Sequence, residues 1–107
     1  MRVIVAMTVL VLLNAASAVP ALAGETVQVR IRDLGFSPAA ISVHAGDIVE
    51  WINDDFIDHT ATARQGDWDI LVPAGKVARS QMTKIGDFEY FCRFHPNMTG
   101  TIGVTAE

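Results

Sequence analysis

Three residue types that bind soft metal ions occur close together near the C-terminus. Cys92, His95 and Met98 are each separated by two residues. A thiolate, an imidazole and a weak, long-range thioether are donors of a blue copper site, which has two His and one Cys in a trigonal plane with an axial Met. The segment therefore predicts three of the four ligands of a copper ion.

The trigonal plane needs a second histidine, and the sequence offers His44 and His59. His44 continues the polar side of an alternating segment, so we expect it to face solvent. His59 begins a predicted strand after a loop, and a β-sandwich places such loop ends beside one another. We therefore predict that His59 is the fourth ligand.

Alternating apolar and polar residues predict the short β-strands that position these ligands. The pattern is strict over residues 26–32, and further strands are expected over residues 41–44, 48–53, 59–63, 76–83 and 99–105. Phe88 and Tyr90 share a face with Cys92 by the period of two, so the strand that begins at Phe88 directs Cys92 inward. Residues 65–75 are rich in turn formers and are expected to form a loop. The pattern predicts an all-β fold, a Greek-key β-sandwich or small barrel.

The N-terminus has the features of a secretory signal peptide. Arg2 precedes a largely apolar run of 11 residues, 3–13, and small residues at 21 and 23 suit signal peptidase. The run is shorter than the roughly 20 residues that cross a bilayer. We predict that residues 1–23 are removed and that residues 24–107 form a periplasmic domain without a membrane span.

Removal of this leader leaves 84 residues, with seven Lys and Arg against twelve Asp and Glu. This length suffices for one domain with a modest core. The acidic balance argues against nucleic acid as a partner. Cys92 is the single cysteine, and an unpaired thiol in an exported protein is buried and inert, pairs between chains or binds a metal. Its spacing from His95 and Met98 favours metal binding.

The segment 49–53, followed by His59 and by the Cys-x-x-His-Pro-x-Met loop that starts at Cys92, resembles the cupredoxin (type 1 blue copper) family, above all its amicyanin-like members. The resemblance covers nearly all of residues 24–107. It implies a Greek-key β-sandwich with one copper ion that cycles between Cu(II) and Cu(I) in a one-electron carrier. Asp58 departs from the family pattern, which often has proline there, and this changes the charge and stiffness of the loop before His59.

The resemblance also implies roles for other residues. Asn53 would hydrogen-bond across to the loop of Cys92, and His95 would be the electron port. An apolar patch would surround this port, with Phe56, Phe94 and Pro96 as its members. The implied redox partners are a periplasmic quinoprotein amine dehydrogenase and a c-type cytochrome, and we expect a monomer.

Asp54, Asp55 and Asp58 form an acidic group beside His59. Such a group is ordinarily a solvated loop. The alternative is a docking patch for a basic electron-transfer partner.

Two other functions compete with electron transfer. A copper carrier or sensor tends to have an open cluster rich in Met or His, whereas residues 24–107 have only two methionines, Met82 and Met98, and a closed set of four predicted ligands. A copper enzyme such as a nitrite reductase needs a second metal site, and His44 is the spare histidine. We therefore expect an electron carrier and no enzymatic activity.

Overall fold

The structure is a computed structural model that describes residues 2–6 and 24–106. Most of the predicted signal peptide, including its cleavage site after Ala23, lies outside these residues. Within the described ranges, no helix is long and apolar enough to cross a membrane.

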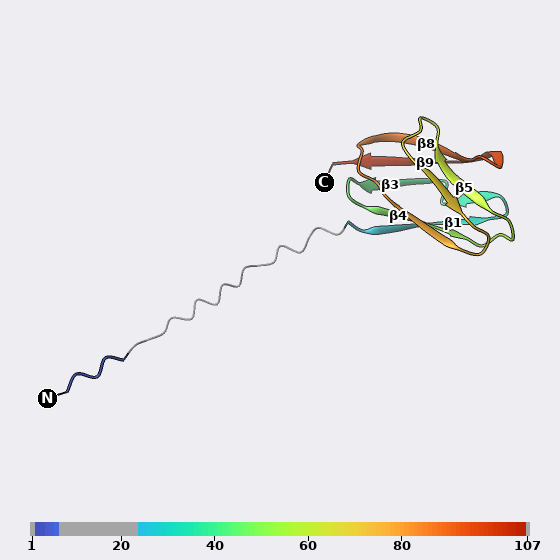
Figure 1. The fold of residues 1–107 in the computed structure, drawn as a ribbon. Helices are drawn as coiled ribbons and strands as arrows, with labels where there is room; N and C mark the ends of the chain where they lie inside the picture. Colours follow the sequence, from blue (N-terminus) through green and yellow to red (C-terminus); the bar gives the residue numbers. More distant parts are fainter. Residues whose placement is uncertain (1, 7–23, 107) are drawn as a thin grey trace.

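Nine β-strands and no helix occur in the part of the chain that the structure describes. In chain order the strands are β1 (Thr26–Arg32), β2 (Gly35–Ser37), β3 (Ala40–His44), β4 (Ile48–Asn53), β5 (His59–Ala63), β6 (Asp69–Val72), β7 (Val77–Gln81), β8 (Gly86–Cys92) and β9 (His95–Thr105). They form a four-stranded sheet in the order β2-β1-β4-β7 and a five-stranded sheet in the order β3-β9-β8-β5-β6. Figure 1 shows the two sheets as stacked layers, with β8 and β9 over β1 and β4. The predicted β-sandwich is confirmed.

Both sheets are mixed, because the chain crosses repeatedly between them. Strand β1 pairs in parallel with β4, and β3 pairs in parallel with β9, while the other pairs are antiparallel. The hairpin of β8 and β9 therefore lies inside the five-stranded sheet, between β5 and β3. This arrangement places the end of β8 beside the start of β5.

The structure adds two strands to the predicted elements and moves the start of another. Residues 69–72 were expected in a loop, but they form the edge strand β6, which pairs with β5 from His59 to Thr62. Strand β2 was not predicted, because its three residues are too few to show a period. Strand β9 begins at His95, four residues earlier than expected, so the loop after Cys92 is a tight turn.

The core fills the space between the sheets and continues to the end of β8. Phe88, Tyr90 and Cys92 are all buried, as the period of two predicted. The Tyr90 ring packs against Phe36 with centroids 4.6 Å apart, and its hydroxyl accepts a hydrogen bond of 3.4 Å from the Trp51 indole. The inward face of β8 thus joins the apolar core directly to the position of Cys92.

Candidate metal centre

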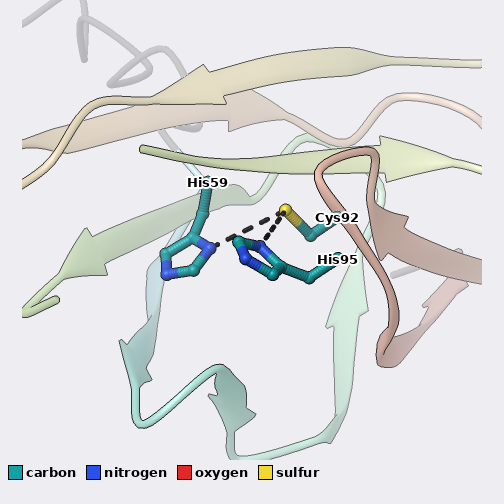
Figure 2. Close-up of side chains that lie close together, drawn as sticks. All are labelled: His59, Cys92 and His95. Carbon is teal, nitrogen blue, oxygen red and sulfur yellow. Dashed lines mark hydrogen bonds between the residues drawn. The ribbon is translucent and has the colours of Figure 1, made fainter. Parts of the chain in front are cut away.

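His59, Cys92 and His95 meet at one end of the five-stranded sheet. One ligand atom from each side chain lies within 4.8 Å of the other two. The Cys92 Sγ is 3.7 Å from His59 Nδ1 and 3.8 Å from His95 Nδ1, and Figure 2 shows both imidazoles turned towards the sulfur. The sequence prediction of these three residues as one cluster agrees with this geometry.

Three strand ends supply the cluster. His59 is the first residue of β5, Cys92 is the last of β8 and His95 is the first of β9. Strands β5 and β8 are antiparallel neighbours, and a register shift between Phe91 and Cys92 interrupts the ladder of β8 and β9 at the turn. Such irregularities re-aim side chains at the end of a strand. The spare histidine His44 is exposed on β3, as its place in the alternating segment predicted.

Hydrogen bonds fix the Cys92 sulfur from the side of β5. Cys92 is fully buried, and its Sγ accepts a bond of 3.3 Å from the backbone N–H of Thr60. The Thr60 hydroxyl oxygen accepts a second bond, of 2.8 Å, from the backbone N–H of Arg93. Thr60, the residue after His59, therefore holds both Cys92 and the start of the turn that leads to His95.

A carboxylate holds the far side of the His59 ring. Asp55 Oδ2 lies 2.8 Å from His59 Nε2, and His59 is fully buried. Asp55 also accepts hydrogen bonds from the backbone N–H groups of Asp33 and Leu34. Burial alone would raise the pKa of Asp55, but the hydrogen bonds from His59, Leu34 and Asp33 outweigh it and hold the pKa below its usual range. A carboxylate only accepts, so the neutral imidazole of His59 carries its proton on Nε2 and presents its Nδ1 lone pair to Cys92.

Asn53 does not make the hydrogen bond that the family resemblance implied. Its fully buried amide donates to the carbonyl oxygens of Ile57 and Val72, and its Oδ1 accepts from the Asp55 N–H. The expected bond to the loop of Cys92 is therefore wrong, because Thr60 occupies that position. Asn53 instead folds the loop that presents Asp55 to His59.

His95 is half-buried beside a hollow of about 360 Å³ on the surface. The hollow is lined by Leu34, Phe94, His95, Pro96, Asn97 and Met98. Phe94 and Pro96 thus flank His95 as expected, but Phe56 is fully exposed and does not line the hollow. Leu34, which was not predicted, lines the hollow instead of Phe56. Sequence reasoning missed Leu34 because it lies in a turn with a positive φ of 59°, far from the ligands in sequence.

The carboxylates of the acidic group beside His59 make ion pairs and hydrogen bonds with other residues of the domain. Asp54 pairs with Arg30 and Arg32, at 3.1 and 3.4 Å. Asp58 accepts a hydrogen bond from the Ala74 N–H. With Asp55 on His59, each of the three carboxylates has a partner in the chain.

The donor set fits copper. Two imidazole nitrogens and one thiol sulfur face one point, and the cluster contains no carboxylate oxygen. Hard ions such as Ca²⁺ and Mg²⁺ prefer oxygen ligands, whereas a trigonal set of two His and one Cys is the plane of a type 1 copper site. His59, Cys92 and His95 are therefore positioned as type 1 copper ligands.

Comparisons with known proteins agree with this donor set. A family model of cupredoxin-like domains matches residues 3–104. Amicyanin from Paracoccus versutus is 28% identical over 98 residues, which cover 82% of this chain and 69% of the relative.

Solved structures show the same fold. A proline-to-phenylalanine variant of amicyanin in its reduced state is 25% identical, with a TM-score of 0.64 over 74% of this chain and 81% of that one. The copper-containing nitrite reductase of Thermus scotoductus is 28% identical, with a TM-score of 0.66 over 77% of this chain. The match spans only 23% of that reductase.

Proposed function

The chain belongs to the family of cupredoxin-like domains, and on this premise we propose that it is an exported one-electron carrier. His59, Cys92 and His95 would bind one copper ion in a trigonal plane, and Met98 would be the weak axial ligand. When bound, the copper supplies a reversible Cu(II)/Cu(I) couple. Met98 is buried beside His95 at the hollow, which is compatible with this role.

The observation that carries the proposal is that the donor cluster is held by the surrounding protein. The Cys92 sulfur has a backbone N–H donor, and the outer nitrogen of His59 has a carboxylate. Pro96 fixes its own φ and restricts His95 before it. A site whose ligands are fixed in this way requires little rearrangement when one electron enters or leaves.

His95 is the proposed electron port. His59 and Cys92 are fully buried, whereas His95 reaches the hollow that Phe94 and Pro96 line. A redox partner seated on this apolar surface would approach the copper through the His95 ring. A periplasmic dehydrogenase and a c-type cytochrome are the partners that we propose.

Removal of residues 1–23 on export is part of the proposal. The largely apolar run of residues 3–13 and the small residues at 21 and 23 support it. The first strand starts at Thr26, so cleavage after Ala23 leaves the sandwich intact. The product would be a monomeric periplasmic domain.

Copper delivery without electron transfer is the second candidate, since the same donors bind Cu(I). Burial of Cys92 and His59 favours retention of the metal over its delivery. Nitrite reduction has less support, because the likeness to the Thermus reductase spans under a quarter of that enzyme. We therefore propose no enzymatic activity.

Voltammetry of the copper-loaded protein in the presence of a Cu(I) chelator separates the two candidates. An electron carrier gives a reversible wave of one electron and keeps its copper over repeated cycles. Loss of the ion to the chelator on each reduction would instead establish delivery. The His44→Ala variant removes an exposed histidine and is the matched control, with an unchanged wave.

A further inference from the structure

An exposed ion pair lies beside the turn that follows Cys92. Arg93 Nε is 3.0 Å from Asp69 Oδ1, and both side chains are about half exposed, at 44% and 54%. The same carboxylate oxygen accepts a bond of 2.7 Å from the Thr62 hydroxyl. Thr62 and Asp69 are partners across strands β5 and β6, so sheet pairing brings them together.

A chain of hydroxyl groups leads from this ion pair to the metal cluster. The Thr62 and Thr60 hydroxyl oxygens are 2.9 Å apart, and Thr60 Oγ1 accepts the Arg93 backbone N–H. Both threonines are buried. The chain is a closed circuit, because it starts at the Arg93 backbone and returns through Asp69 to the Arg93 side chain.

The carboxylate sets the direction of both hydrogen bonds that a threonine hydroxyl donates in the circuit. An ionised carboxylate only accepts, so the single hydroxyl proton of Thr62 points to Asp69. The proton of Thr60 must then point to Thr62, which leaves the Thr60 oxygen free to accept from Arg93. The hydrogen bonds from Thr62 and Arg93 hold the pKa of Asp69 below its usual range, which keeps this acceptor ionised at neutral pH.

We propose that Asp69 is a positioning residue for the metal-binding turn, acting through Thr62 and Thr60 on Arg93 and on the Cys92 sulfur. Thr60 is the link to the ligand, because its N–H bonds to Cys92 Sγ while its hydroxyl bonds to the next residue of the turn. An exposed ion pair alone contributes little to stability. The circuit gives this one a second role, which is to fix the sulfur relative to His59 and His95.

The first test uses the metal-free protein and does not depend on the proposed function. Thr62→Val removes the hydroxyl at nearly constant volume, so the Thr60 hydroxyl loses its acceptor and its oxygen is no longer held towards the Arg93 N–H. We expect the Arg93 amide to exchange with solvent faster by up to about tenfold, the effect of losing one typical hydrogen bond. Asp69→Ala should have the same effect, and Thr62→Ser should restore protection. The control Asp67→Ala breaks the exposed pair with Lys84, 3.0 Å, outside the circuit and should leave the Arg93 amide unchanged.

The second test uses the copper-loaded protein. The charge-transfer band of the copper–thiolate bond and the reduction potential should shift in Thr62→Val and Asp69→Ala and return in Thr62→Ser. A general loss of stability without repositioning of the sulfur would move neither the charge-transfer band nor the reduction potential. If Thr62→Val does not fold, Asp69→Ala, which truncates a side chain that is about half exposed, supplies the same comparison.

Unchanged Arg93 exchange in folded Thr62→Val and Asp69→Ala would overturn the inference. Equal shifts in Asp67→Ala would overturn it as well, since that variant leaves the circuit intact. A wild-type protein without the copper–thiolate band would refute the proposed function, while the exchange measurement would still decide the positioning role.

Discussion

The carboxylate of Asp55 lies 2.8 Å from Nε2 of His59, on the side of the ring opposite Cys92. This contact fixes both the orientation of the imidazole and the nitrogen that carries the proton. A histidine held in this way presents a preformed Nδ1 lone pair to a metal ion.

Replacement of Asp55 by alanine should therefore weaken copper binding. Outer carboxylate partners of metal-binding histidines typically contribute about ten- to a hundredfold in metal affinity. Competition with a chelator of known affinity measures the change. Asp54→Ala is the matched control, since Asp54 pairs with Arg30 and Arg32 and not with a ligand. An equal loss in both variants would contradict a specific role for Asp55.

Met98→Leu tests the proposed axial ligand. Leucine conserves the volume of this buried side chain, so the free energy of unfolding should change by less than about 1.5 kcal/mol. Loss of a donor that stabilises Cu(II) should raise the reduction potential while the blue colour persists. Voltammetry and the visible spectrum check both points, and an unaltered potential would remove Met98 from the ligand set.

Gly100 is required where β9 passes the Tyr90 ring. A Cβ atom at this position would lie 2.6 Å from ring atoms of Tyr90, its partner on β8. Gly100→Ala should therefore lower the free energy of unfolding by about 1–3 kcal/mol. Urea unfolding measures this, with Gly103→Ala on the same strand as control, where the nearest contact is 3.3 Å from the flexible Asp87 carboxylate. Equal stabilities would contradict the close packing at Gly100.

Tyr90 predicts how stability depends on alkaline pH. Burial raises the pKa of Tyr90 from 10.0 to about 12, although the hydrogen bond from Trp51 acts in the opposite direction. The folded state therefore keeps the phenol proton where the unfolded state has lost it. The stabilisation is fully present below pH 10 and is lost as the pH rises through about 12.

The expected loss of unfolding free energy over this window is about 3 kcal/mol, from about 1.4 kcal/mol for each pH unit. Tyr90 is the single tyrosine of the chain, so tyrosinate absorbance reports this group alone. Urea unfolding at several pH values should show the loss in the wild type and a smaller one in Tyr90→Phe. Titration of the Tyr90 phenol near pH 10 in the folded protein would contradict the burial argument.

Local patterns predicted the parts of the site that depend on strand period and spacing. The period of two placed Cys92 inward with Phe88 and Tyr90, and the spacing of Cys92 and His95 matched their meeting across a tight turn. The positions of the two histidines relative to the predicted strands correctly assigned His59 to the cluster and His44 to the surface.

Contacts between distant segments were beyond such patterns. In the sequence, Asp55 is one of several acidic residues in a loop. Its bond to His59 depends on how residues 33–34 fold against it. Thr60, for which the sequence predicted no role, makes the bond to the turn after Cys92 that was expected of Asn53, because sheet pairing and not residue type decides which side chain faces that turn. The edge strand β6 formed in a turn-rich segment for the same reason, through pairing with β5.

The visible absorption spectrum of the purified protein with one equivalent of Cu(II), before and after Cys92→Ser, tests the central claim most directly. The wild type should turn intensely blue, bleach reversibly with a mild reductant and lose the band in the variant. Matched loading of His44→Ala should leave the colour intact. Cu(II) that binds without this band, or a band that survives Cys92→Ser, would contradict a copper site built on the Cys92 sulfur.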